Sequence, residues 1–212
     1  MVELLQVLLA KGADPDNMDA ERPLLSLLNW YFDRRTHITL GSKVLQCAQI
    51  LINLTDDPDI MCSIGDWIRP NNVDEHAWWE MGVIHQLIEI GLDETWAERL
   101  DVVKALIGLF AESSSNRTIV PADPNHSHNQ LTPLLRVCLL GWTECIPGFA
   151  MGTTNFNVKG PQGKTPLHIA SKTGNEAMIQ ALLNGGAKVG RVSHSIQHFY
   201  KPGFLTIISD LS

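Results

Sequence analysis

A spacing of 33 residues between two similar segments is the feature that most limits how this chain can fold. The segment LTPLLRVCLLGW begins at Leu131 and KTPLHIASKTGN begins at Lys164, so their Thr-Pro-Leu triplets and glycines recur 33 residues apart. A fixed period of this length is the signature of a solenoid, in which short supersecondary units stack on their neighbours. We therefore expect repeated units that bury their apolar faces on one another.

The second segment predicts a pair of helices. Thr165 can cap the first helix with its hydroxyl, and Pro166 suits the first helical position because the missing N–H has no partner there. Gly174 allows the turn that follows, and Gly185 and Gly186 are predicted to end the second helix by allowing a positive φ. Apolar residues recur at helical spacing between that turn and the two glycines: Met178, Ile179, Leu182 and Leu183.

The same residues carry a resemblance to a known family. TPLHIA (165–170) matches the T-P-L-H-x-A pattern of the ankyrin repeat, and ALLNGGAKV (181–189) resembles its L-L-x-x-G-A ending. The resemblance implies an all-α solenoid of stacked helix-turn-helix units. It also implies that His168 is a hydrogen-bonding strut in the turn, with no catalytic or metal-binding role.

The resemblance makes residues 1–190 one ankyrin-repeat domain, followed by a C-terminal tail at 191–212. It is strong over 131–189, fair over 2–53 and weak between them. The tail abandons the pattern and is either a capping segment or an unrelated end introduced by splicing. The predicted units are a partial repeat (1–19), a repeat with a loop insertion (20–55), a degenerate helical hairpin (73–111) and two further repeats (131–163 and 164–190).

The hairpin and the start of the chain depart most from the pattern. Asp74 is predicted to cap the first hairpin helix and Gly91 to end it, while Thr95 and Glu98 form a predicted capping box for the second. A foreign helical insert is the alternative to a degenerate repeat here. Because the chain begins in mid-repeat, we expect a fragment or isoform of a longer protein, which the intact mass of the native protein would test.

The GKT at 163–165 raises the alternative of a nucleotide-binding enzyme. A phosphate-binding loop needs the pattern G-x-x-x-x-G-K-[ST], so that several backbone N–H groups can turn toward one phosphate. Val158 stands where the first glycine is required, and Gly160 leaves too short a loop. The GPQGKT reading is therefore the remote alternative, and no enzyme, cofactor or metal is expected.

The composition limits which kinds of binding partner and which cellular compartment are expected for this chain. The net charge of -7 and the absence of a basic stripe disfavour nucleic acid. The apolar runs are too short to cross a membrane, and the start lacks the features of a signal peptide. The 4 cysteines are far apart and suit a reducing compartment. We expect a monomer in the cytoplasm, with the nucleus as the alternative, and another protein as the partner.

The family resemblance also implies where a partner binds, namely at loop tips and on the exposed side of each first helix. Carried over by position, the contact residues of the last repeat are Pro161, Gln162, Lys164, Lys172 and Thr173. Those of the preceding repeat are His128, Asn129, Leu131, Leu139 and Leu140, and those of the first are Asn29 and Trp30.

Two of these predictions have a second interpretation. Leu139 and Leu140 either form an apolar binding patch or are covered by the loop 112–130. Trp30 is either a binding hot spot or packs against the insertion that follows it. The leading hypothesis for function is a non-catalytic scaffold or adaptor that brings proteins together. Substrate recruitment for a ubiquitin ligase is the regulatory alternative.

Overall fold

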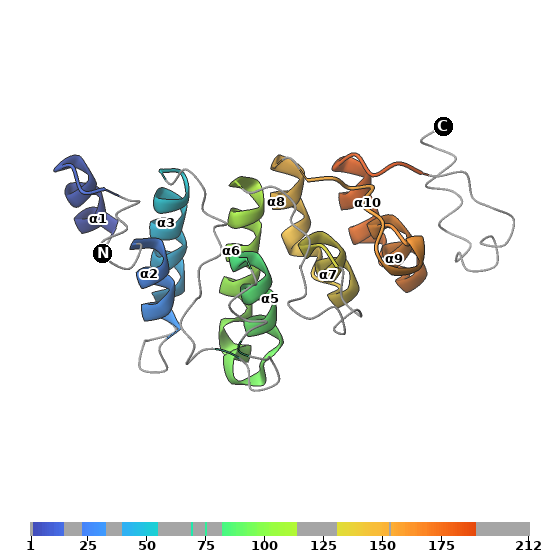
Figure 1. Ribbon diagram of the computed structural model, residues 1–212, viewed down its shortest axis with the longest axis horizontal. Helices are drawn as coiled ribbons and strands as arrows, with labels where there is room; N and C mark the ends of the chain where they lie inside the picture. Colours follow the sequence, from blue (N-terminus) through green and yellow to red (C-terminus); the bar gives the residue numbers. More distant parts are fainter. Residues whose placement is uncertain are drawn as a thin grey trace, which may run out of the picture.

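The regular secondary structure is helical throughout the described part of this computed structural model, which comprises residues 2–14, 23–32, 40–54, 69, 75, 82–113, 131–152 and 154–189. The elements follow one another in a row from α1 to α10 (Figure 1). Their bounds are α1 (Val2–Ala10), α2 (Pro23–Tyr31), α3 (Gly41–Ile52), α5 (Val83–Leu92), η3 (Glu94–Arg99), α6 (Leu100–Ser113), α7 (Pro133–Leu140), η4 (Thr143–Cys145), α8 (Ile146–Met151), η5 (Pro161–Gly163), α9 (Pro166–Thr173) and α10 (Glu176–Asn184).

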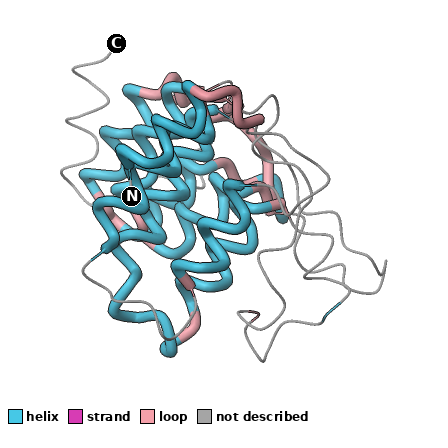
Figure 2. Tube along the Cα trace, turned by 90° about the vertical axis from the view of Figure 1, so that its left-hand side faces the viewer, coloured by secondary structure: helices cyan, strands magenta, loops and turns pink. Residues whose placement is uncertain are grey.

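The helices form antiparallel pairs that stack in two layers. The pairs are α2 with α3, α5 with α6, α7 with α8, and α9 with α10. The second helix of each pair lies in one layer, in which α3, α6, α8 and α10 pack in that order, and α1 packs on α3 at the start of this layer. The first helices α5, α7 and α9 pack on one another in the other layer. Figure 2 shows the same stack from its side. The all-α solenoid of stacked helix pairs predicted from the sequence is confirmed.

The last two pairs begin and turn as the sequence predicts. Thr132 and Thr165 each accept a hydrogen bond on their hydroxyl from a backbone N–H three residues on. Gly141 and Gly174 close α7 and α9 in the left-handed conformation, at φ 75° and 67°. Because these two pairs of positions are both 33 residues apart, the sequence repeat is a repeat of hydrogen bonds and backbone angles.

Two glycines predicted to end helices serve for close packing. Helix α5 runs past Gly91 to Leu92, and a methyl group on Gly91 would lie 2.7 Å from the Trp142 ring. Gly185 has a right-handed φ of -77°, and a methyl group there would lie 2.5 Å from the Phe156 ring. Gly91 does not end α5, so that prediction was wrong. Gly185 stands at the end of α10 as predicted, but without the predicted positive φ, which Gly186 has at 93°.

The turn between α5 and α6 also differs from the prediction. Asp93 caps the 3₁₀ helix η3, because its Oδ1 accepts a hydrogen bond of 2.8 Å from the Thr95 backbone N–H. The predicted capping box of Thr95 with Glu98 was therefore wrong, since the chain already turns into a helix two residues earlier. The predicted cap Asp74 lies outside the described residues.

Buried Arg99 connects the first pair of helices to the second. Its guanidinium donates a hydrogen bond to the Tyr31 carbonyl at the end of α2, where the exposed carbonyls favour a cation. The guanidinium carbon also lies 5.0 Å from the Tyr31 ring centre and 5.2 Å from that of Trp96. Phe32 packs edge-on against both aromatic rings. This cluster joins α2 to the η3–α6 segment.

None of the helices in the described ranges is long and apolar enough to span a lipid bilayer.

Candidate protein-binding surface

The loop before α9 is an exposed turn held by its own backbone. Gly160 donates its N–H to the Lys164 carbonyl at 2.9 Å, and Gly163 donates its N–H to the Gly160 carbonyl at 3.0 Å. Gln162 takes a left-handed φ of 61°, which is uncommon for a residue with a side chain. Pro161, Gln162 and Lys164 are all exposed at this tip, as predicted for contact residues, although their contact with a partner stays a prediction.

The start of α9 is built by Thr165 and His168. The His168 backbone N–H donates to the Thr165 hydroxyl at 3.4 Å, and the His168 Nδ1 accepts the Thr165 N–H at 3.3 Å. The same Nδ1 lies 2.7 Å from the Thr165 hydroxyl oxygen. His168 is thus a strut across the helix start, as the resemblance implies. Its ring thus binds Thr165, directly after the loop, to the first turn of α9.

Two more predicted contact residues lie at the far end of α9. Lys172 and Thr173 are exposed, and the Thr173 hydroxyl donates to the Ala170 carbonyl at 3.0 Å. That bond keeps the Thr173 side chain against its own helix. The loop tip and the end of α9 thus each have one exposed lysine, Lys164 and Lys172.

The repeat of α7 presents a different surface. Leu139 is 53% exposed, at the position that corresponds to Lys172. Leu131 and Leu140 are partly buried and pack against the core, so they contribute to stability more than to an open patch. His128, Asn129 and the loop 114–130 lie outside the described residues.

The first repeat confirms one predicted exposure and contradicts another. Trp30 is 44% exposed, whereas Asn29 is buried with 8% of its surface exposed. The transfer by position fails at Asn29 because α2 turns that side chain inward and presents Trp30 to solvent instead. The insertion after Phe32, against which Trp30 was predicted to pack, lies outside the described residues.

The loops of the last two units are also joined to each other. Asn157 donates from its side-chain amide to the Gly186 carbonyl at 3.4 Å and accepts the Lys188 backbone N–H at 2.7 Å. Asn175 caps α10 by accepting the Met178 N–H and also donates to the Thr143 hydroxyl at 3.2 Å. These bonds give the surface around α9 a defined shape.

A buried polar cluster between α5 and α7 was missed from the sequence. Arg136 of α7 pairs with Glu89 of α5, whose side chain is 8% exposed. His85, one turn before Glu89, is buried beside them, and within the described residues its Nε2 has no hydrogen-bond partner. Burial, aided by the positive charge of Arg136, lowers the pKa of His85 to about 3. The spacing of four residues between His85 and Glu89, on one helix face, was the signal available in the sequence.

The described ranges hold no group of three or more His, Cys, Asp and Glu side chains that could bind a metal ion.

Comparison with known proteins agrees with this architecture. Residues 95–193 match the family model described as ankyrin repeats in three copies. This match supports an ankyrin repeat protein over residues 95–193, and the all-α repeat fold is that of the family. The matched range begins in η3 and includes α6, α7, α8, α9 and α10. No curated protein and no solved structure matched the chain.

Proposed function

We propose that this protein is a non-catalytic protein-binding module whose contact surface lies on the last two repeats. Ankyrin repeats generally mediate interactions between proteins. The observation that carries the proposal is the arrangement around α9, where Gln162, Lys164 and Lys172 are exposed on a loop and helix held by internal hydrogen bonds. A rigid surface loses little conformational entropy on binding, which favours affinity.

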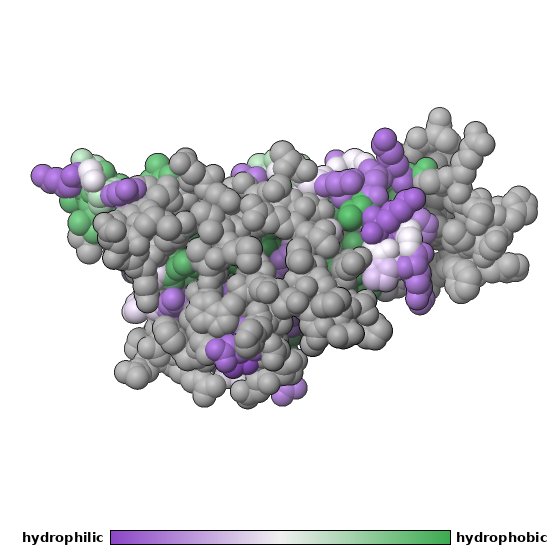
Figure 3. Space-filling model, viewed as in Figure 1, coloured by the Kyte–Doolittle hydropathy of each residue, from purple (hydrophilic) through white to green (hydrophobic). Residues whose placement is uncertain are grey.

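The charge of this surface indicates the chemistry of the partner. Residues 154–189 contain four lysines, all exposed, and Glu176 as the single acidic residue, although the whole chain has a net charge of -7. The lysines are Lys159, Lys164, Lys172 and Lys188. Figure 3 shows hydrophilic side chains gathered over the α9 and α10 end. We infer an acidic protein surface as the partner, because complementary charge speeds association and selects against basic competitors.

The alternatives receive less support. In the GPQGKT loop, the N–H groups of Gly160, Gly163 and Lys164 donate to carbonyls within the loop, so they do not converge on a phosphate. No feature of the described residues favours recruitment for a ubiquitin ligase. A monomeric state and a cytoplasmic location remain predictions from the sequence.

The test compares two doubly substituted chains with equal charge. Lys164→Glu with Lys172→Glu reverses the charge at the proposed surface. Lys11→Glu with Lys43→Glu makes the same change of net charge at two other exposed lysines, of which Lys11 follows α1 and Lys43 lies on α3. Both chains and the natural one are used for affinity capture from source cells with quantitative mass spectrometry, with and without nuclease. Captured proteins are then purified and their binding is measured directly.

Proteins lost with the first variant and retained with the second, whether or not nuclease is present, support the proposal. Equal capture by all three chains would place binding elsewhere. Capture that disappears on nuclease treatment would mean that the lysines contact nucleic acid.

A further inference from the structure

Two exposed leucines lie side by side at the ends of neighbouring first helices. The buried ion pair of Glu89 with Arg136 places these two positions opposite each other on α5 and α7, which run in the same direction as first helices of their pairs. Leu92 and Leu139 each follow three residues later, so they lie one turn further along the same helix faces. Leu92 is 43% exposed and Leu139 is 53% exposed. The buried contact between α5 and α7 therefore continues to the surface as an apolar pair.

A tryptophan holds together the two helix ends that carry these leucines. Trp142 follows α7, and its ring lies so close to α5 that a methyl group on Gly91 would be 2.7 Å from it. Only 8% of Trp142 is exposed. The Lys104 ammonium lies 5.9 Å from the centre of this ring and 3.5 Å from the Glu144 carboxylate. Because these contacts fix both helix ends, the leucines lose little conformational freedom when a partner binds.

The charges on the two sides of the leucine pair are opposite. On one side, Lys172 occupies on α9 the position that Leu139 has on α7, and α9 packs on α7. On the other side, Glu94 begins η3, which packs on α5 and contacts the first helix pair through Trp96. Both Lys172 and Glu94 are exposed. The row is therefore negative at one end, apolar in the middle and positive at the other end. We call it the leucine strip: Glu94, Leu92, Leu139 and Lys172.

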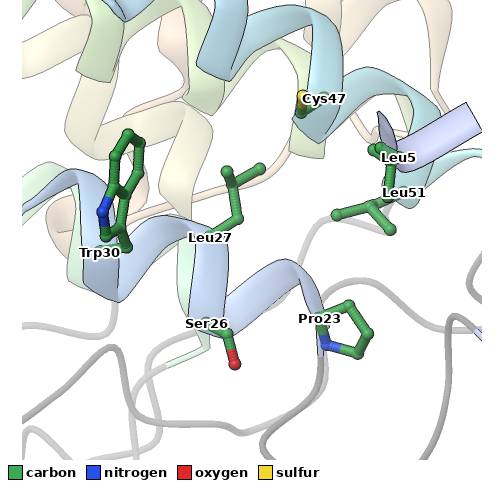
Figure 4. A pocket seen from close by; sticks show the side chains of 7 residues that line it. All are labelled: Leu5, Pro23, Ser26, Leu27, Trp30, Cys47 and Leu51. Atoms are coloured by element: carbon green, nitrogen blue, oxygen red, sulfur yellow. The ribbon is translucent and has the colours of Figure 1, made fainter. Parts of the chain in front are cut away.

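The exposed Trp30 of α2 does not belong to the leucine strip. It lines a cavity between α1, α2 and α3, together with side chains that include Leu27 and Cys47 (Figure 4). The leucine strip instead lies on α5, η3, α7 and α9, which follow later in the row of helices (Figure 1). Trp30 and the leucine strip are therefore separate surfaces.

We propose that the leucine strip binds an extended segment of a partner protein that carries a basic residue, two aliphatic residues and an acidic residue, in that order. The inference rests on the proposed function, because Lys172 belongs to both surfaces. The order follows from charge complementarity, since a basic group faces Glu94 and an acidic group faces Lys172. The aliphatic groups between them lose contact with water on the two leucines, which favours binding.

The spacing of the helices favours an extended segment. Packed helices lie about 8–10 Å apart, and the leucine strip has one contact residue at the end of each of α5, α7 and α9. A polyproline II segment has about three residues per turn and a rise of about 3.1 Å per residue, so its i, i+3 and i+6 side chains lie on one face about 9 Å apart. An α-helix rises only about 1.5 Å per residue and would need about six residues for each of these steps.

The test measures binding of designed peptides to the full chain. The probe is a fluorescein-labelled peptide of sequence KLPPLPPE, in which proline favours the polyproline II conformation. One control peptide, KSPPSPPE, replaces both leucines by serine. The other, KLPPLPPK, replaces the acidic residue that is predicted to face Lys172. Fluorescence anisotropy at physiological ionic strength gives the dissociation constant of each peptide.

Variants of the chain locate the binding. Leu92→Ala and Leu139→Ala each remove an exposed apolar side chain and are expected to weaken binding of KLPPLPPE at least fivefold. Met151→Ala removes an apolar side chain that is 70% exposed at the end of α8, outside the leucine strip, and is the matched control. Lys172→Glu is expected to weaken binding of KLPPLPPE and to strengthen binding of KLPPLPPK.

Binding that is lost with KSPPSPPE, weakened by both leucine substitutions and unchanged by Met151→Ala supports the proposal. A dissociation constant above about 1 mM for KLPPLPPE, or the same affinity for all variants, overturns it. Equal preference of the natural chain and Lys172→Glu for the two charged peptides also overturns it.

The capture experiment with Lys164→Glu and Lys172→Glu separates this inference from the proposed function. If capture depends on these lysines but KLPPLPPE does not bind, the leucine strip is wrong and the proposed function stands. If capture is also independent of the lysines, both proposals are wrong.

Discussion

The backbone of Gly148 in α8 lies directly against the backbone of Gly108 in α6. A methyl group on Gly148 would lie 2.6 Å from both the Cα and the carbonyl carbon of Gly108. The reverse does not hold, since a methyl group on Gly108 would have no neighbour within 4 Å. Gly152, one turn further along the chain, approaches the carbonyl of Ala111 in the same way. Glycine thus sets the separation of the two helices.

Gly148→Ala and Gly108→Ala are predicted to change stability in opposite directions. The first forces α8 away from α6 and lowers the free energy of unfolding by about 1–3 kcal/mol, as overpacking does. The second fills open space in a helix and raises it by about 0.5–1 kcal/mol, because alanine loses less backbone entropy than glycine. Urea unfolding of the two variants measures both effects. Equal destabilisation by both would contradict the packing of α6 on α8.

Removing one partner of the Glu89–Arg136 ion pair is predicted to lower stability strongly, whereas replacing both partners by apolar residues is predicted to lower it little. Arg136→Met alone leaves the buried Glu89 carboxylate without its cation and is expected to lower stability by about 3–5 kcal/mol. Adding Glu89→Leu removes the stranded charge and should restore most of that loss. A double-mutant cycle by chemical unfolding checks the prediction. Additive losses in the double variant would show that the pair is not coupled.

Because His85 is buried, the stability of the folded chain is predicted to fall as the pH is lowered below about 6.5. The pKa of His85 is about 3 in the folded chain and 6.5 in the unfolded chain. Between these values the unfolded state binds a proton that the native state does not, so stability declines by up to about 1.4 kcal/mol per pH unit. Full stability is present above pH 6.5 and is lost as the pH falls toward 3.

Nearby Glu89 acts in the opposite sense. Burial raises its pKa above 4.5, against the effect of Arg136, and so favours the folded state as the pH falls through that range. The measurement is therefore the difference in stability between the natural chain and His85→Gln, from pH 7.5 to 4. This difference isolates the histidine. A difference that does not change with pH would mean that His85 is already charged or exposed in the native state.

The thiols of Cys138 and Cys145 are predicted to be unreactive in the folded chain. Both are buried, and burial raises the pKa of each to about 12. Only the thiolate reacts, so alkylation at pH 8 should be roughly a hundredfold slower or more than in urea. Iodoacetamide labelling with peptide mapping measures each cysteine separately. Rapid labelling of both in native buffer would mean that α7 or η4 opens readily.

The start of α9 and the turns around it could be predicted from the sequence alone. Thr165 and His168 bond to each other across three residues, and Gly141 and Gly174 close their helices by their own backbone angles. Each of these features depends on a few neighbouring residues, so a short motif contains all that is needed to form it. The 33-residue period then implies that such units stack.

The tertiary structure decided which side chains those stacked units bury. Gly91 packs against Trp142 inside α5, although the local pattern marks it as a helix end. Gly185 packs against Phe156 with a right-handed φ, although the local pattern predicts a positive one. Asn29 is buried where alignment with Lys172 places a contact residue. Burial and close approach join residues tens of positions apart, so the sequence alone determined the repeating unit, and only the packed array determined its surfaces.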